Sequence, residues 1–275
     1  MQIKTERLTT EGNSTPDRQA QMTRHLYAHE SASIQQLAEL TGASIATVRR
    51  DLTRLGADGV ILRTHGGARI ANQSDERLAF DIRAVENAPA KLAVAEAAFA
   101  LLRPNSTILL DSGTTILQLA RMIRLHPLPL TVFTNGLRIA LELIDTAQVN
   151  LVLLGGDLRR GHLSATGPMT ETQLKQLWFD QLYLGAGGID SQLRVCSVDS
   201  LGAQLNAAMI ERAEETYLLA DASKYGRRAT YVVAPLQAAT RVVVDDTLSG
   251  EWTSRLANSE ISLTIAASRP GYETD

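Results

Sequence analysis

The fold of the first domain is decided by the stretch Ser44-Ile-Ala-Thr-Val-Arg-Arg-Asp-Leu-Thr-Arg-Leu55. Its periodicity predicts an amphipathic helix whose apolar face is formed by Ile45, Val48, Leu52 and Leu55. Ser44 stands where a capping hydroxyl is expected, and Arg50 and Arg54 lie opposite the apolar face. Arg49 and Asp51 fall on the two flanks. Such a helix can bury one face in a small core and present the other to the major groove of DNA.

The neighbouring segments predict a winged helix-turn-helix domain over residues 15–70. Thr15-Pro16 can start a first helix that runs to about Glu30, because proline is favoured at the first helical position. Ser33 can cap a second helix, which the tight turn Thr41-Gly-Ala43 ends. Downstream, Gly59-Val-Ile-Leu-Arg-Thr-His-Gly-Gly-Ala68 predicts a short β-ribbon, or wing. The alternative is a helical hairpin with a solvated basic face, and the wing favours DNA binding.

The candidate DNA contacts lie on the outer face of the third helix and on the wing. Arg50 and Thr47 are expected to face base edges, since arginine can pair bidentately with guanine. Residues 1–70 hold 9 Lys/Arg against 7 Asp/Glu, so the placement of these side chains carries the prediction rather than the bulk charge. The predicted DNA-binding residues are Ser44, Thr47, Arg49, Arg50, Arg54, Arg63 and His65.

Length and composition predict a two-domain cytoplasmic protein. The chain has 275 residues, 44% of them hydrophobic, and no apolar run approaches the length of a membrane span. Cys196 is the only cysteine, so no internal disulfide can form. The 5 histidines show no metal-ligand spacing, and neither a metal site nor a cofactor is expected.

A polar segment, 71–89, is predicted to link the first domain to a second one over 90–267. From Thr107 onward, short apolar runs end abruptly in small or polar residues, and helical segments often follow. The runs are Ile108-Leu-Leu110, Leu130-Thr-Val-Phe133, Leu151-Val-Leu-Leu154, Leu182-Tyr-Leu184, Tyr217-Leu-Leu-Ala220 and Val242-Val-Val244, with a last strand over 261–266. Continuous apolar runs are typical of strands covered on both faces, so an α/β fold with a mainly parallel sheet is expected.

Ligands of such sheets bind beyond the carboxyl ends of the strands, where the glycines and polar residues of this chain collect. Asp111-Ser-Gly-Thr-Thr115 is the best candidate, because its hydroxyls and Gly113 stand at the start of a helix, which suits an anion. The alternative is an ordinary N-capping turn. The predicted effector-binding residues of these strand ends are Asp111, Ser112, Gly113, Thr114, Thr115, Thr134, Asn135, Gly155, Gly156, Gly185, Gly187, Asp221 and Lys224.

The chain resembles the DeoR family of transcriptional regulators from about Asp17 to Asp246. The resemblance rests on Thr47-Val-Arg-Arg-Asp-Leu52, Arg63-Thr-His-Gly-Gly-Ala68, Leu110-Asp-Ser-Gly-Thr-Thr115, Thr131-Val-Phe-Thr-Asn135, Leu154-Gly-Gly156 and Leu219-Ala-Asp-Ala-Ser-Lys-Tyr225. It implies a winged helix DNA-binding domain joined to a sensor domain of the ribose-phosphate-isomerase-like fold. Family members generally bind a phosphorylated sugar or a related metabolite, which typically releases DNA.

The chain departs from this family pattern at two positions. Similar family members carry an acidic residue and a lysine in the helix after an effector-site aspartate. Here the aspartate is Asp199, and the matching positions are Gly202 and Asn206. The change implies either an effector other than a simple sugar phosphate or contacts from other residues. It also argues against catalysis, which needs a positioned base and groups that stabilise an enediolate.

The sequence therefore predicts a transcriptional regulator without catalytic residues, most simply a repressor of a carbohydrate-metabolism operon. Its expected partners are a double-stranded DNA operator and a small-molecule effector, a phosphorylated sugar in the first instance. A homodimer or homotetramer is expected because one winged helix makes few DNA contacts. Two alternatives remain: a sugar-phosphate isomerase fused to a helix-turn-helix domain, and a module whose first domain contacts protein.

Overall fold

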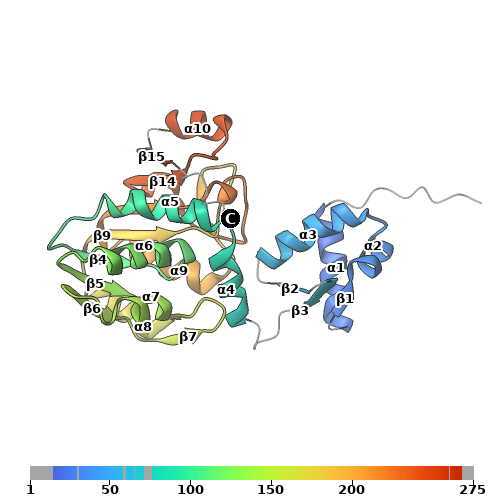
Figure 1. Ribbon diagram of the computed structural model, residues 1–275, viewed down its shortest axis with the longest axis horizontal. Coiled ribbons are helices and arrows are strands. Elements are labelled where there is room, and N and C mark those ends of the chain that lie inside the picture. Colours follow the sequence, from blue (N-terminus) through green and yellow to red (C-terminus); the bar gives the residue numbers. More distant parts are fainter. Residues whose placement is uncertain are drawn as a thin grey trace, which may run out of the picture. The chain divides into compact units, whose positions relative to one another are not determined.

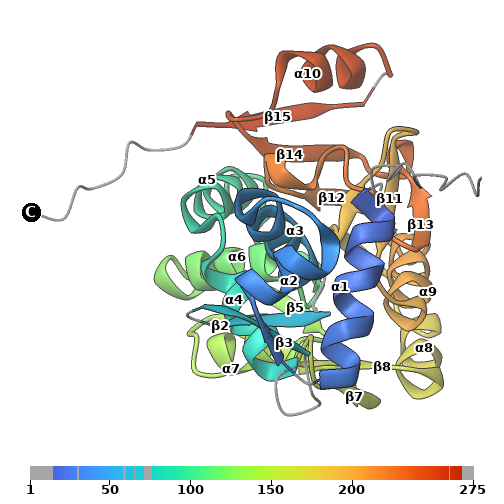
Figure 2. The same ribbon diagram turned by 90° about the vertical axis from the view of Figure 1, so that its right-hand side faces the viewer.

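The chain divides into two compact units, Met1–Ala79 and Phe80–Asp275. The computed structural model describes residues 15–29, 31–57, 60–64, 66–70, 76–259 and 261–267. Figures 1 and 2 show the elements of both units. The division falls inside the segment predicted as a linker, 71–89. Much of that segment is structured, because it contains α4 (Glu76–Val85) and the start of α5 (Ala88–Phe99).

The first unit combines three helices with a small antiparallel sheet of strand order β1-β3-β2. In chain order its elements are α1 (Thr15–His29), β1 (Ser31–Ser33), α2 (Ile34–Thr41), α3 (Ile45–Ala57), β2 (Ile61–Thr64) and β3 (Gly67–Ile70). The three predicted helices and the predicted ribbon are confirmed. Strand β1, which the sequence did not predict, adds a third strand to the wing.

Local chemistry explains how these elements begin and meet. Ser33 and Gln36 form a capping box. The backbone N–H of Gln36 donates to Ser33 Oγ at 3.2 Å, and the backbone N–H of Ser33 donates to Gln36 Oε1 at 2.8 Å. Gly42 has φ 66°, which lets the chain turn sharply between α2 and α3. Gly67 lets β1 and β3 approach, since a Cβ there would stand 2.1 Å from the Ala32 carbonyl oxygen.

The core of the first unit holds the apolar face of α3 against α1 and α2. Its fully or nearly fully buried side chains include Met22, Leu26, Leu37, Val48, Leu52, Leu55 and Ile61. The prediction that Ile45 joins this face is wrong, because its side chain is 44% exposed. Side chains lean toward the N-terminus of a helix, so the first residue of α3 projects past the helix end and away from the core.

The second unit is built on a seven-stranded sheet of order β15-β14-β12-β9-β4-β5-β6. All of its strand pairs are parallel, as predicted. The strands are β4 (Thr107–Leu110), β5 (Leu130–Thr134), β6 (Val149–Leu153), β9 (Phe179–Gly185), β12 (Ala213–Leu219), β14 (Arg241–Asp245) and β15 (Leu263–Ala266). Each overlaps one of the apolar runs that predict strands, so these strands are confirmed.

Helices cover both faces of this sheet. They are α5, α6 (Thr114–Leu125), α7 (Leu137–Leu143), α8 (Pro168–Lys175), α9 (Ser200–Ile210) and α10 (Gly250–Ala257). Figure 1 shows α5, α6 and α7 side by side along one face of the sheet. Ile108 and Leu110 of β4 belong to the core cluster on that face, whereas Leu109 belongs to the cluster that includes Leu205 and Met209 of α9. The strands are therefore buried on both sides.

Short elements complete the second unit near the carboxyl ends of the long strands. They are the antiparallel pair β7 (Asp157–Arg159) and β8 (Ser164–Thr166), the sheet of β10 (Gly188–Ile189), β11 (Arg194–Ser197) and β13 (Tyr231–Pro235), and the 3-10 helices η1 (Ala222–Lys224) and η2 (Leu236–Ala238). The sequence predicted none of these short elements.

Within the described ranges, no helix has both the length and the hydrophobicity needed to cross a membrane.

Candidate functional site

The N-terminus of α3 is held by the hydroxyl predicted to cap it. The Thr47 amide donates to Ser44 Oγ at 3.2 Å, and the hydroxyl oxygens of Ser44 and Thr47 lie 2.9 Å apart. Both side chains are thus fixed at the first turn of the helix, and Ser44 is exposed. A helix N-terminus with exposed hydroxyls is a favourable place for a DNA phosphate.

The basic face of α3 is exposed as predicted. Arg49, Arg50 and Arg54 are all exposed, and none of their side chains belongs to the core. Arg63 of β2 donates from Nη1 to Thr53 Oγ1 at 3.2 Å, which brings the wing arginine beside the outer face of α3. Arg63 and the exposed arginines of α3 therefore belong to neighbouring elements of the domain. His65, also predicted to contact DNA, lies outside the described residues.

Asp51 lies inside the domain rather than on an open flank of α3. It is only 2% exposed, and its carboxylate accepts from Arg18 Nε at 2.5 Å and from Gln19 Nε2 at 3.2 Å. Both partners come from α1, so this ion pair fastens α3 to α1. A carboxylate beside a DNA-binding face would repel phosphates, and here Arg18 neutralises it.

In the second unit, the predicted loop after β4 packs against the end of β9. Asp111 is buried, and its Oδ2 accepts from the Gly185 amide at 3.1 Å while Ser112 Oγ lies 3.4 Å from Oδ1. Burial raises the pKa of Asp111, although these hydrogen bonds oppose the shift. A Cβ on Gly185 would stand 3.2 Å from Asp111 Oδ2, so glycine permits this approach. Gly113 begins α6 without a side-chain cap from the described residues, unlike an ordinary N-capping turn.

Several other predicted effector residues have local structural roles. Thr134 donates from Oγ1 to the Leu110 carbonyl at 2.8 Å, and Asn135 donates from Nδ2 to the Ala165 carbonyl at 3.0 Å. The Gly155 amide donates to Gln173 Oε1 at 3.2 Å. Close packing explains the remaining two glycines: a Cβ would lie 2.1 Å from Thr170 Oγ1 at Gly156 and 2.8 Å from the Cys196 carbonyl oxygen at Gly187.

Asp221 and Lys224 lie in the loop after β12. Asp221 is 1% exposed, and its Oδ1 accepts from Asn87 Nδ2 at 3.2 Å and from the Ser223 amide at 3.1 Å. Its Oδ2 is buried without a hydrogen-bond partner among the described residues. Burial lowers the pKa of Lys224, and the nearby carboxylate of Asp221 opposes that shift.

Lys224, which was predicted to bind the effector, lies with four other basic side chains that were not predicted to do so. We call Arg83, Lys91, Arg159, Lys224 and Arg227 the basic cluster. Their charges influence one another: Arg159 and Arg227 lower the pKa of Arg83, and Arg83 lowers that of Lys224, in each case together with burial. The five basic side chains outnumber the neighbouring carboxylates Glu86, Asp111, Asp199 and Asp221. The only sequence signal was Lys224 at a strand end, because the other members come from distant segments.

Arg159 also explains the departure of this chain at Gly202. Arg159 Nη2 lies 3.0 Å from Asp199 Oδ2, and Asp199 Oδ1 accepts from the Gly202 amide at 2.7 Å to cap α9. A Cβ on Gly202 would stand 2.5 Å from Arg159 Nη1. The guanidinium thus fills the space that a side chain at 202 would take. The nearby His162 is neutral, because burial and the charges of Arg159 and Arg83 lower its pKa to about 3.

Lys91 makes the stability of the second unit depend on pH. Its side chain is 3% exposed, and burial lowers its pKa from 10.5 to about 8; Asp221 and Glu86 oppose the shift, and Lys224 and Arg83 add to it. The unfolded chain therefore holds this proton more tightly than the folded one. Stability is lost as the pH falls from 10.5 to about 8 and is regained as it rises.

We expect the free energy of unfolding of the second unit to rise by roughly 1–2 kcal/mol between about pH 7 and pH 9.5 through Lys91 alone. Urea denaturation at a series of pH values, for the wild type and Lys91→Met, isolates this contribution. Lys224 is present in both proteins, so the difference between them reports Lys91 together with its interaction with Lys224. If the free energy of unfolding changed with pH in the same way in the two proteins, the expectation would be contradicted.

Together the two units define a class of protein: a ligand-responsive transcription regulator, with a helix-turn-helix domain and a sensor domain. The DeoR-like helix-turn-helix family matches residues 18–74, and the DeoR C terminal sensor domain family matches residues 86–246. The chain belongs to the DeoR family.

Three curated relatives span nearly the same length. The Putative aga operon transcriptional repressor of Escherichia coli is 30% identical, covering 91% of this chain and 94% of the relative. The Transcriptional repressor AccR of Agrobacterium fabrum is 33% identical, covering 85% and 90%. The L-fucose operon activator of Haemophilus influenzae is 31% identical, covering 79% and 86%.

Among solved structures, ribose 5-phosphate isomerase A from Methanocaldococcus jannaschii is similar to part of the chain. The similarity covers 49% of this chain and 53% of that chain, with 19% identity and a TM-score of 0.36. Such a partial match carries no functional assignment. The curated relatives, by contrast, are named as regulators.

Proposed function

We propose that the protein represses a carbohydrate-metabolism operon in the cytoplasm and that a phosphorylated sugar, bound at the basic cluster, controls it. The single observation that carries the effector assignment is this cluster, which gathers five cationic side chains around the loops at the strand ends. Burial is the main cause of the lowered pKa values of Arg83, Lys91 and Lys224, and repulsion from neighbouring cations adds to it; an anion there would offset that repulsion. A phosphate group, with about two negative charges near neutral pH, is an anion that such a group of cations attracts.

The DNA-binding domain, residues 15–70, would read an operator through α3. Arg50 is proposed to pair with a guanine, with Thr47 beside it at the base edges. Arg49, Arg54 and Arg63 would bind phosphates on either side. Such a division is common in protein–DNA complexes, where phosphate contacts fix the register and base contacts give specificity. Ser44 and His65 are proposed as further phosphate contacts.

Arg50→Ala is expected to weaken binding to the preferred operator by about 1–3 kcal/mol and to relax specificity at one base pair. The reason is that a bidentate arginine–guanine pair is lost while the phosphate contacts remain. Binding to a set of singly substituted operators measures both effects. Arg54→Ala is the matched comparison, because it should weaken all the operators to the same extent. If Arg50→Ala did the same, its proposed base contact would be wrong.

A selection of genomic fragments at near-physiological salt tests the repressor assignment and supplies the operator. One or a few enriched sites with repeated half-sites would support a specific regulator, and the adjacent genes would indicate the metabolite class. Steep weakening of binding with salt would point to phosphate contacts. Binding with no sequence preference and a shallow salt dependence would contradict the proposal and favour a protein partner.

The effector is tested by release of that operator in a panel of phosphorylated sugars and their unphosphorylated counterparts. Release by a phosphorylated member alone would support the assignment. Stronger binding would instead indicate activation, the mode named for the relative from Haemophilus influenzae. Equal effects of phosphorylated and unphosphorylated members would contradict a role for the basic cluster in recognising phosphate.

We further propose a homodimer or homotetramer, because a single winged helix offers few contacts to DNA. Light scattering at working concentration tests this oligomeric state.

A catalytic role is not proposed. Asp199 already accepts a hydrogen bond from Gly202 and pairs with Arg159, so its carboxylate is poorly placed to act as a base.

A further inference from the structure

The junction between α4 and α5 is tied directly to the loop that carries Asp221 and Lys224. Asn87, which separates the two helices, has φ 51°, in the left-handed region. Its Nδ2 donates to Asp221 Oδ1 at 3.2 Å and lies 3.0 Å from Ser223 Oγ. An asparagine in this conformation can hold a sharp turn while its amide reaches outward. The turn between the helices thus follows the position of the Asp221 loop.

Two members of the basic cluster tie α4 itself to the same region. Lys91, on α5, donates from Nζ to the Arg83 carbonyl oxygen at 2.6 Å and also to the Glu86 carbonyl oxygen. It thereby satisfies carbonyl groups at the C-terminal end of α4. Arg83 donates from Nη2 to the Gly161 carbonyl oxygen at 2.6 Å, between β7 and β8. Side chains proposed to meet the effector therefore also position α4.

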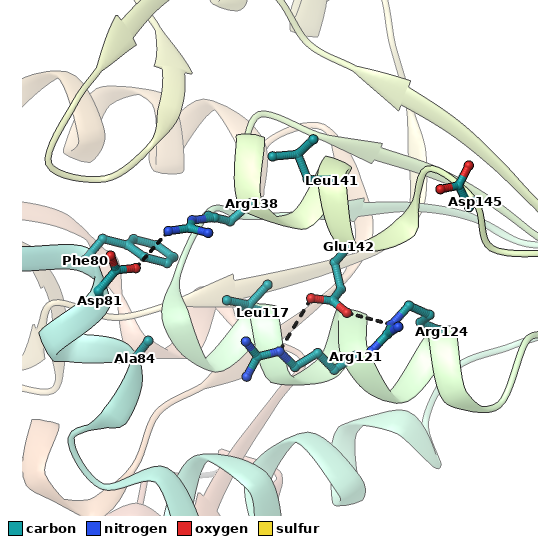
Figure 3. A pocket seen from close by; sticks show the side chains of 10 residues that line it. All are labelled: Phe80, Asp81, Ala84, Leu117, Arg121, Arg124, Arg138, Leu141, Glu142 and Asp145. Atoms are coloured by element: carbon teal, nitrogen blue, oxygen red, sulfur yellow. Dashed lines mark hydrogen bonds and ion pairs between the residues drawn. The ribbon is translucent and has the colours of Figure 1, made fainter. Parts of the chain in front are cut away.

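A neighbouring side of α4 borders a pocket of about 440 Å³. Figure 3 shows Phe80, Asp81 and Ala84 of α4 facing it, opposite side chains of α6 and α7. One ion pair crosses between α4 and α7, from Arg138 Nη2 to Asp81 Oδ1 at 2.9 Å. Phe80 anchors α4 in the core cluster beneath the pocket, whereas the pocket leaves space beside Asp81 and Ala84.

We infer that the α4–α5 junction is a clasp that couples the loop of Asp221 and Lys224 to the position of α4, with Asn87 as its central positioning residue. The signalling role of this clasp rests on the proposed effector site. Because α4 follows the DNA-binding domain in the chain, a shift of α4 has a direct covalent route to that domain. An effector changes the equilibrium only to the extent that it favours one arrangement of the clasp.

Asn87→Gly tests the clasp, because glycine keeps the positive φ and removes only the side-chain amide. Asn105→Gly is the matched control: Asn105 has φ 66° but precedes β4, at the amino ends of the strands. In ligand-free protein, hydrogen exchange should become roughly tenfold faster in both α4 and the 221–225 loop of Asn87→Gly, as expected for one or two lost hydrogen bonds. Faster exchange in α4 with an unchanged loop would overturn the clasp.

Inorganic phosphate, compared with chloride at equal ionic strength, tests whether the clasp transmits ligand binding. In the wild type and in Asn105→Gly, phosphate should slow exchange in both the 221–225 loop and α4. In Asn87→Gly it should slow exchange in the loop only, and equal slowing of α4 would overturn the inference. If phosphate changed neither segment of the wild type, the proposed effector site would be contradicted, and the ligand-free comparison would still decide whether the clasp exists.

Discussion

Arg18→Met is expected to destabilise the DNA-binding domain by about 3 kcal/mol, because it leaves the carboxylate of Asp51 buried without its charged partner. Asp51 is 2% exposed, and its hydrogen bond from Gln19 alone cannot replace the arginine. Small domains bury less of their surface and have correspondingly little stability to spare. Operator binding should therefore be lost near physiological temperature. Calorimetry should show a lowered transition for this domain and an unchanged one for the sensor domain.

Two further variants separate charge burial from lost packing. Arg24→Met removes an exposed arginine from the same helix and should leave the transition in place. Arg18→Met combined with Asp51→Leu removes both charges and should recover much of the lost stability, as replacement of buried ion pairs often does. If Arg18→Met and Arg24→Met had equal transition temperatures, the ion pair would not hold α3 against α1.

Local sequence patterns were enough to predict the helix-turn-helix and the long strands. Helical periodicity located α3, and the Ser33 cap located α2, because both depend on residues close together in the chain. Unbroken apolar runs predicted strands covered on both faces, and therefore a parallel sheet. Strand β1 was missed because it has three residues and depends on close contact with Gly67, far along the chain.

The candidate effector site was predicted only in part, for the same physical reason. The loops at the strand ends follow from the topology of any parallel sheet, and Asp111, Asp221 and Lys224 lie on them. Arg83 and Arg159 instead reach this region from α4 and β7. Nothing in their local sequence indicates that tertiary packing brings them together. The burial of Asp51 was likewise invisible until its partner on α1 was known.

Lys224→Met is expected to weaken binding of the phosphorylated sugar that releases the operator by about 2–5 kcal/mol, the usual loss when one partner of a buried charge pair is truncated. Lys224 is partly buried within the basic cluster, so solvent screens its charge less than that of a surface lysine. Calorimetric titration with the phosphorylated sugar and with its unphosphorylated counterpart measures the effect. Only the phosphorylated ligand should lose affinity, because the lysine recognises charge rather than hydroxyl groups.

Lys175→Met provides the matched control, since Lys175 is an exposed lysine of the same domain at the end of α8. It should bind both ligands as the wild type does, which separates a local contact from a general change in charge. Raising the pH above about 8 should further weaken binding of the phosphorylated ligand, because Lys91 then loses its proton. Equal losses for the two ligands in Lys224→Met would show that the lysine supports the loop after β12 instead of binding phosphate, and the effector would then have to be sought elsewhere on the sensor domain.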